Sequence, residues 1–301
     1  MSKTLAEVKK CIPLYALLLP AIVLVICFAY VPMYGVIIAF KDYSPARGIM
    51  DSAWAGLKHF NRFFNSFQFG TIMRNTLGIS FYSLAVGFPL PIIFALFINQ
   101  MKAGLFKRFF QTVTYMPHFI STVVMVGLLI LLLSPSSGIF GSICRALGFA
   151  APNLMANAGA FSSVYVWSDV WQHLGWDSII YIAALASVDP TLYEAATIDG
   201  ASRWHKLIHI DFPMILPTAG ILLIMRLGSV LGVGFEKVYL MQNTLNLDTS
   251  EVIATYVYKM GLLSSQYSFS AAVGLFNTLV NFVLLVIVNR VSSKISDNAL
   301  F

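Results

Sequence analysis

Polar and aromatic side chains stand close together in an apolar stretch, residues 162–188. One helix face carries Asp169, Gln172, His173 and Trp176, with Trp167, Trp171 and Asp177 beside it. These four fall within a sector of about 100° on a helix. A charge at mid-bilayer costs about 2.5–3.5 kcal/mol even on the lenient scale, so this face should look into a cavity or at partner helices.

Two kinds of chemistry suit this face. Aromatic rings stack on the apolar faces of sugars while carboxylates and amides bind sugar hydroxyls, so contact with a sugar is one hypothesis. Hydrogen bonding between packed helices is the other, and it is equally common among buried polar groups. Further polar side chains occur in later apolar segments. The candidates for a substrate path are Trp167, Asp169, Gln172, Trp176, Asp177, Arg226, Asn277 and Asn281.

Arg226 needs a counter-charge inside the apolar region, and Asp169 or Asp177 could supply it. If Asp169, His173 and Asp177 instead formed a proton relay, the chain would be a secondary transporter, which is the alternative function.

Motifs for covalent or nucleotide chemistry are missing. The sequence has no G-x-x-x-x-G-K-[ST] loop to hold phosphates, no H-E-x-x-H and no G-x-S-x-G. His205 and His209 stand four apart, a spacing more often seen on a polar helix face than at a metal site. We therefore expect no enzyme activity and no nucleotide, metal or other cofactor on this chain.

The composition indicates an all-α integral membrane protein. Of 301 residues, 58% are hydrophobic and 11% charged, against about 25% charged in soluble domains. The net charge of +6 is spread over many short loops, which argues against nucleic acid. The apolar composition implies that the chain lies in a lipid bilayer. Cys11, Cys27 and Cys144 are too far apart to suggest a disulfide framework.

Six apolar segments are long enough to cross a bilayer. We expect them at residues 14–40, 75–99, 112–133, 162–188, 214–241 and 270–288. The first should bend near Pro20 or Pro32, and the second contains Pro89 and Pro91, which a helix bundle tolerates. Residues 100–111 read as a connector, and a short helix should start at Ser250.

The segments before and between the expected spans are more polar. Residues 1–13 form an N-terminal segment, and residues 41–74 form a loop in which Phe60, Phe63, Phe64 and Phe67 recur at helical spacing. That spacing suits a helix lying in the membrane interface, although a solvated loop with a small hydrophobic cluster fits equally well. With six spans, both termini lie on one side. Lys and Arg near the spans weakly favour the cytosolic side for them.

The loop at residues 189–213 is a polar segment between two apolar ones. Its helix start and stop signals predict two short helices that meet at a bend. Asp189 and Pro190 suit a helix start, and Gly200 a helix end. Ser202 can cap a second helix that Pro213 should stop. Small residues flanked by charge indicate a docking element rather than a catalytic one.

This loop resembles the E-A-A…G…I-x-x-P loop of permease subunits of binding-protein-dependent ABC importers. The likeness rests on Glu194-Ala195-Ala196, Gly200, Ile210 and Pro213. It implies a cytosolic coupling helix that fits a cleft on an ATPase. The implied coupling residues are Glu194, Ala195, Ala196, Asp199, Gly200, Ala201, Arg203 and Trp204.

Further blocks extend the resemblance from about Leu14 to the C-terminus. Y-V-P-M-Y-G-V-I-I-A-F-K-D-Y, Y-M-P-H-F-I-S and A-V-G-L-F-N-T-L-V-N are similar to the polysaccharide branch of these permeases. The branch implies the type I importer fold with a MetI-like core over residues 75–301. It also implies a bacterial cytoplasmic membrane, a second permease, two ATPase subunits that bind ATP and Mg, and an external binding protein delivering an oligosaccharide.

Overall fold

The computed structural model describes residues 12–295, and the chain divides into two compact units. Unit 1 comprises residues 1–66 and 257–276, and unit 2 comprises residues 67–256 and 277–301. The expected N-terminal segment, residues 1–13, lies almost entirely outside the described residues. The end of the expected cytosolic tail, beyond residue 295, also lies outside them.

Unit 1 begins with an apolar helical run, Leu14–Phe40, with a mean hydropathy of 2.6. Its side chains are exposed up to Tyr34, whereas Ala39 near its end is buried. It comprises α2 (Ile12–Val25), a π-helical turn (Ile26–Tyr30), α3 (Val31–Met33) and a 3-10 helix (Tyr34–Phe40). Pro20 lies inside α2, and Pro32 lies in the first turn of α3, shortly after the π-helical turn. The bend expected at one of these prolines stays a prediction, and the observed feature near Pro32 is a change of helix type.

A small β-hairpin follows, which the sequence analysis did not foresee. Strand β1 (Lys41–Ser44) pairs antiparallel with β2 (Gly48–Trp54), with Lys41 opposite Trp54. The Lys41 ammonium group donates to the carbonyls of Ile49 and Met50, both at 2.7 Å. These bonds close the hairpin from inside, which explains why a lysine is buried there.

Helix α4 (Lys58–Phe64) carries Phe60, Phe63 and Phe64, three of the four phenylalanines expected in an interfacial helix, while Phe67 lies beyond its end. Phe63 is only 1% exposed, and its ring lies against Phe269 and Phe276 at centroid distances of 6.3 and 5.6 Å. Residues 58–64 are therefore helical rather than a loop, and Phe63 packs in a small cluster of aromatic rings within unit 1. Lys58 also holds the pKa of Asp42 below its usual range by hydrogen bonding its carboxylate.

The remainder of unit 1 comes from late in the chain. Helix α16 (Ile253–Tyr258) is followed by a π-helical turn (Lys259–Leu263) and by the start of α17 (Tyr267–Ile295). The short helix expected from Ser250 thus begins at Ile253. A second short helix, α15 (Leu247–Ser250), precedes it. The expected sixth span, residues 270–288, is confirmed as helix, although α17 is longer at both ends.

In unit 2, the second span is one apolar helical run, Phe69–Gln100, formed by α5 (Phe69–Gly87) and α6 (Pro89–Gln100). It starts earlier than the expected residue 75. Phe88 separates the two helices, so Pro89 and Pro91 fall in the first turn of α6. There the missing N–H of a proline costs no hydrogen bond within the helix.

The expected third span, residues 112–133, is wrong as a single helix. The structure has α7 (Leu105–Tyr115) and a 3-10 turn (Met116–Phe119), and then α8 (Thr122–Leu132) at 102° to them. The backbone is extended at Ile120 and Ser121, and Ser121 caps α8 through the Val124 N–H. Residues 105–111, expected to be connector, belong to α7, and α9 (Ile139–Ala146) follows α8 in the next loop.

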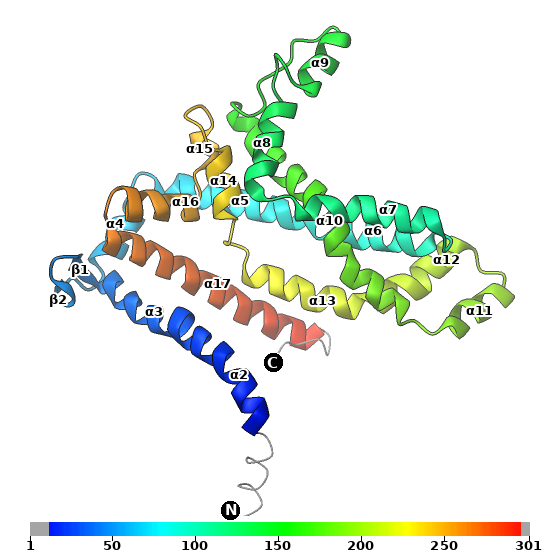
Figure 1. Ribbon diagram of the computed structural model, residues 1–301, viewed down its shortest axis with the longest axis horizontal. Helices are drawn as coiled ribbons and strands as arrows, with labels where there is room; N and C mark the ends of the chain where they lie inside the picture. The colour runs from blue at the N-terminus through cyan, green and yellow to red at the C-terminus, as the bar shows by residue number, and fades with distance from the viewer. Residues whose placement is uncertain (1–11, 296–301) are drawn as a thin grey trace, which may run out of the picture. The chain divides into compact units, whose positions relative to one another are not determined.

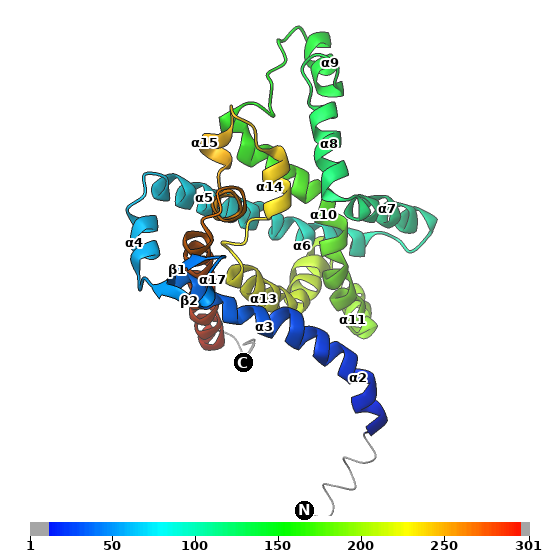
Figure 2. The same ribbon diagram turned by 60° about the vertical axis from the view of Figure 1, so that its left-hand side comes forward.

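Helix α10 (Phe161–Ala186) is the centre of unit 2, and its bounds agree closely with the expected span 162–188. It packs against α5, α6, α7 and α13 (Phe212–Gly228), as Figures 1 and 2 show. The contact with α7 is close, since a Cβ on Gly175 would collide with the Thr114 carbonyl. Gly175 is therefore required by the approach of two backbones.

The expected fifth span, residues 214–241, is interrupted. Helix α13 (Phe212–Gly228) ends, residues 229–234 form turns and extended backbone, and α14 (Phe235–Met241) follows. Gly228, Gly232 and Gly234 concentrate in this region, where backbone freedom disfavours a continuous helix. Within residues 12–295, four helices are long and apolar enough to cross a membrane. The number rises to six if each of two bent pairs is one span.

Two apolar cores flank the middle of α10. One gathers around Phe161, Tyr165 and Val166 near its start, and the other around Tyr181 and Leu185 near its end. The polar residues 169–177 lie between them. The same helix is therefore anchored at both ends by apolar packing, while its central turns face a different environment.

Candidate functional site

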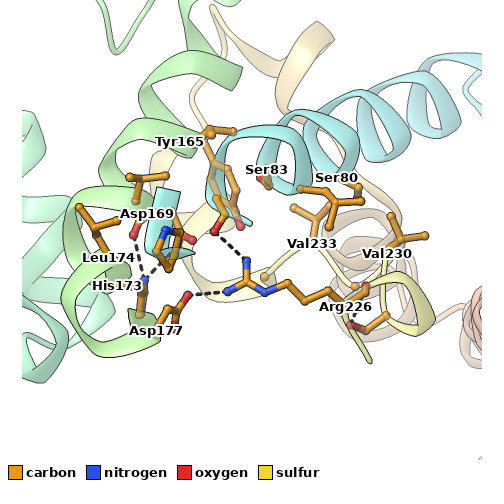
Figure 3. A pocket seen from close by; sticks show the side chains of 18 residues that line it. Ser80, Ser83, Tyr165, Asp169, His173, Leu174, Asp177, Arg226, Val230 and Val233 are labelled. Atoms are coloured by element: carbon orange, nitrogen blue, oxygen red, sulfur yellow. Dashed lines mark hydrogen bonds and ion pairs between the residues drawn. The ribbon is translucent and has the colours of Figure 1, made fainter. Parts of the chain in front are cut away.

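A half-open cavity of about 230 Å³ lies against the polar middle of α10. Its walls come from α5, the start of α6, α10, α13 and the break at residues 229–234 (Figure 3). The interrupted fifth span thus makes room for the cavity, because a continuous helix would place side chains there. Irregular backbone at membrane depth is tolerated where it lines such a space.

Two candidate carboxylates face this cavity from α10. Asp169 lies 3.2 Å from the ammonium nitrogen of Lys237 and 3.5 Å from Nδ1 of His173. Lys237 also donates to the Tyr165 carbonyl at 3.2 Å and is buried. The sequence analysis did not include Lys237 among the candidates. A lysine beside a glycine-rich stretch in an apolar region could have indicated a buried charge that needs a partner.

The second carboxylate, Asp177, pairs with Arg226 at 2.5 Å. Of the two expected counter-charges for Arg226, Asp169 and Asp177, the structure shows Asp177. Arg226 reaches across from α13 and also donates to the Gly87 carbonyl at 3.3 Å (Figure 3). The pair fixes the distance between α13 and α10, and both side chains remain partly exposed, at 40% and 29%.

A second cavity, of about 200 Å³, shares Pro91, Asp177 and Arg226 with the first. The ion pair therefore stands between two spaces along α10. Trp176 lines the second cavity, and its ring stacks on His118 at 4.2 Å with 2° between the planes. Trp176 is still 42% exposed, so part of the ring is available to a ligand.

Two serines in the first cavity wall were missed in the sequence analysis. Ser80 and Ser83 lie one turn apart on α5, and their hydroxyl oxygens are buried without a hydrogen-bond partner. Serines are common in membrane helices, so only their position relative to α10 marks them. A buried hydroxyl without a partner costs free energy, which a polar ligand or water would recover.

Other sequence candidates hold helices together. Gln172 is buried and donates to the Ile120 carbonyl at 2.8 Å, which ties α10 to the bend before α8. Asn281 accepts from the Leu231 backbone N–H at 3.1 Å and so satisfies the break in the fifth span. Both fit the inter-helix alternative. Trp167 donates to the Tyr82 hydroxyl at 3.0 Å, and the Asn277 amide oxygen is buried without a partner.

The loop at residues 189–213 forms an elbow that begins with α11 (Pro190–Ile198). The Asp189 carboxylate caps α11 by accepting from the Thr191 N–H at 2.9 Å, which lowers the pKa of Asp189. Gly200 has φ +75° and closes the helix end, where the Ala201 N–H bonds the Ala196 carbonyl at 2.8 Å. These features confirm the expected helix signals.

The second arm of the elbow differs from expectation. Ser202 caps α12 (Arg203–Lys206) through the His205 N–H. A π-helical turn (Leu207–Asp211) then leads directly into α13, so Pro213 does not stop the helix. Pro213 falls within the first turn of α13, where its missing N–H is accommodated by the π turn.

The outer surface of the elbow is exposed and partly apolar. Glu194, Ala195, Asp199, Gly200, Arg203 and Trp204 are exposed, whereas Ala196 and Ala201 are half-buried. Ile198 is 86% exposed and Trp204 63%, so two large apolar side chains are uncovered on the elbow. The elbow therefore presents a surface suited to another protein.

A buried carboxylate, Asp211, connects the elbow to the bundle. Asp211 is fully buried and accepts from Tyr193 on α11, from Asn99 at 3.2 Å and from Gln100 at 2.6 Å. Burial and the hydrogen bond to Asp211 raise the pKa of Tyr193 to about 12. Three elements thus meet at Asp211, a residue whose role no sequence motif had suggested.

The apolar helices enclose a cavity lined by charged side chains, and the elbow presents a surface for docking another protein. Together these features define a membrane permease that takes its energy from a partner protein. Residues 87–297 match the family described as binding-protein-dependent transport system inner membrane components, and the chain belongs to this family. It is the permease subunit of an ABC importer and not the subunit that hydrolyses ATP. The secondary-transporter alternative is accordingly wrong.

The relatives agree along nearly the whole chain. The polygalacturonan/rhamnogalacturonan transport system permease protein YteP of Bacillus subtilis strain 168 is 41% identical over 96% of this chain and 90% of its own length. Protein LplB of the same strain is 40% identical over 96% of this chain and 91% of its own.

A solved structure shares the fold. It is a chain in the crystal structure of a bacterial ABC transporter involved in the import of the acidic polysaccharide alginate. The two chains superpose with a TM-score of 0.90 and 38% identity, covering 98% of this chain and 99% of the other. The type I importer permease fold implied by the sequence resemblance is thereby confirmed.

Proposed function

We propose that this chain and a second, related permease line the path of an oligosaccharide through the cytoplasmic membrane of a bacterium. An external binding protein delivers the oligosaccharide. Two copies of an ATPase bind ATP and Mg and supply the energy, so this chain carries no cofactor. The names of the relatives support this substrate class, since YteP is named for polygalacturonan and rhamnogalacturonan and the solved transporter for alginate.

The observation that carries the substrate class is the cavity between α5, α10 and α13. Its wall contains serine hydroxyls without hydrogen-bond partners, and also two carboxylates and a guanidinium group. The half-exposed ring of Trp176 lies in the adjoining cavity. Sugars require both hydrogen-bonding groups for their hydroxyls and ring faces for their apolar side. A path for a purely apolar solute would not need this wall.

The elbow is the proposed contact with the ATPase. Glu194 supplies a charged contact, Ala195, Ala196 and Ala201 a small-residue surface, and Ile198 and Trp204 exposed apolar area. Asp211 links α11 to α6 and α13, so a push on the elbow is passed to two helices that line the cavity. In this arrangement the elbow and both termini are cytosolic, and the spans number six.

The test is uptake by proteoliposomes that contain the complete importer and enclosed ATP. Gly200→Asp should lose uptake and ATPase stimulation by the loaded binding protein, because its carboxylate disturbs the docking surface. Gly148→Asp is the matched control. Gly148 has φ +79° and, like Gly200, open space around it, so the backbone strain is similar while the elbow is intact. Uptake that persists without ATP but collapses with an uncoupler would contradict the proposal.

A further inference from the structure

The cavity wall contains hydrogen-bonding groups that no other part of the described chain satisfies. The hydroxyls of Ser80 and Ser83 lack partners, and Ser80 is only 7% exposed. Both lie on α5 in the wall of the cavity that Arg226 enters from α13. The wall is therefore prepared for a polar molecule that brings several hydroxyl or carboxylate oxygens.

Arg226 is the one Arg or Lys that the structure places in this wall within residues 12–295. A guanidinium has five N–H donors, and the contacts to Asp177 and the Gly87 carbonyl engage its two terminal nitrogens. Its side chain is 40% exposed. The nearby Lys237 is buried and committed to Asp169 and to the Tyr165 carbonyl. A ligand in the cavity can therefore reach Arg226 but not Lys237.

The contact between Asp177 and Arg226 can give way to a ligand. It joins one nitrogen to one carboxylate oxygen, so it lacks the paired hydrogen bonds of a bidentate contact. A bidentate carboxylate would match the planar guanidinium better than Asp177 does. Because the pair also separates the two cavities, binding at Arg226 would loosen the contact between α10 and α13.

We propose that this cavity is a subsite for one acidic sugar unit, with Arg226 binding the sugar carboxylate and Ser80 and Ser83 binding hydroxyls. Asp177 is the resting counter-ion of Arg226, which keeps the charge paired when the subsite is empty. The inference rests on the oligosaccharide path proposed above and narrows its substrate to uronate-containing sugars. It makes Arg226 a specificity-determining residue.

The experiment measures binding to the complete permease–ATPase assembly in nanodiscs, without binding protein, by calorimetry. The probes are trigalacturonate and its carboxyl-reduced, neutral counterpart. The wild type should bind the acidic trisaccharide about tenfold or more tightly than the neutral one, since hydrogen bonds to charged groups are the stronger ones. Arg226→Gln should abolish the preference, and Arg226→Lys should retain part of it.

Two further variants keep the test decisive if Arg226→Gln does not assemble. Asp177→Asn should tighten binding of trigalacturonate and leave the neutral sugar unchanged, because the competing carboxylate is gone. The double variant Ser80→Ala and Ser83→Ala should weaken the binding of both trisaccharides by the same factor. An Asp177→Asn variant with unchanged affinity for the acidic sugar would overturn the inference, as would a preference that survives Arg226→Gln.

The outcomes separate this inference from the proposed function. If the importer binds and transports both trisaccharides equally well, the oligosaccharide path stands and the acidic subsite is wrong. If neither trisaccharide binds, the acidic subsite is wrong, while the oligosaccharide path is judged separately by the ATP dependence of uptake.

Discussion

Single residues decide how closely the helices of this permease approach one another. Gly175 allows α10 to touch the Thr114 carbonyl, and Gln172 and Trp176 on the same helix contact the segment that follows. The contact fixes the bend between α7 and α8 against α10. A residue without a side chain is thus as important to the site as the charged residues one turn away.

Gly175→Ala should destabilise the protein by about 1–3 kcal/mol, because its Cβ overlaps a backbone carbonyl that cannot rotate away. The measurement is the thermal midpoint of the purified permease in detergent. Gly78→Ala on α5 is the control, since nothing lies within 4 Å of a Cβ there. Equal midpoints for the two variants would contradict the close packing of α7 on α10.

At the scale of elements, Asp211 connects the elbow to the bundle through hydrogen bonds. Its carboxylate sits in a π-helical turn, and π turns inside helices often mark functional sites. The hydrogen bonds from Tyr193, Asn99 and Gln100 connect α11, α6 and the start of α13. Movement of α11 alone would break at least one of these bonds, so the three elements should move together.

Tyr193→Phe should reduce sugar uptake per ATP hydrolysed while the complex still assembles, because α11 loses its hydrogen bond to Asp211. Asp211→Ala should do so more strongly and cost about 1–3 kcal/mol for each buried donor left without a partner. The effects of the double variant should be less than additive, since both remove the same bond. Tyr30→Phe, on an exposed ring of the first span, is the control.

At the scale of the whole molecule, the position of the elbow determines the topology. If the elbow is cytosolic, the loop between α8 and α10 must lie on the other side of the membrane, and both termini on the elbow's side. Four straight spans and two bent ones are compatible with this arrangement.

Single cysteines should report this topology once Cys11, Cys27 and Cys144 are replaced by serine. Ser136→Cys, exposed in the loop after α8, should react with a membrane-impermeant maleimide in intact spheroplasts. Ser187→Cys, exposed at the end of α10, should react only after permeabilisation. Labelling of Ser187→Cys in intact spheroplasts would reverse the orientation and remove the elbow from the cytosol.

The sequence by itself determined the class of protein and most of the elbow. Composition and apolar run length are local properties, and so are the helix-capping preferences of Asp189, Gly200 and Ser202, which the structure confirms. The bounds of α10 also followed from the sequence, because one long apolar stretch of helical length has few alternatives.

Only the tertiary structure decided which polar residues meet. The pairing of Asp177 with Arg226 and of Asp169 with Lys237 depends on how α10, α13 and α14 cross, and spacing along the chain does not encode that. The break at residues 229–234 and the 102° bend after α7 also became visible only in the tertiary structure. Asn281 on α17 accepts from the Leu231 N–H at the break, and Ser121 caps α8 at the bend. Hydropathy alone predicts one continuous span in each region.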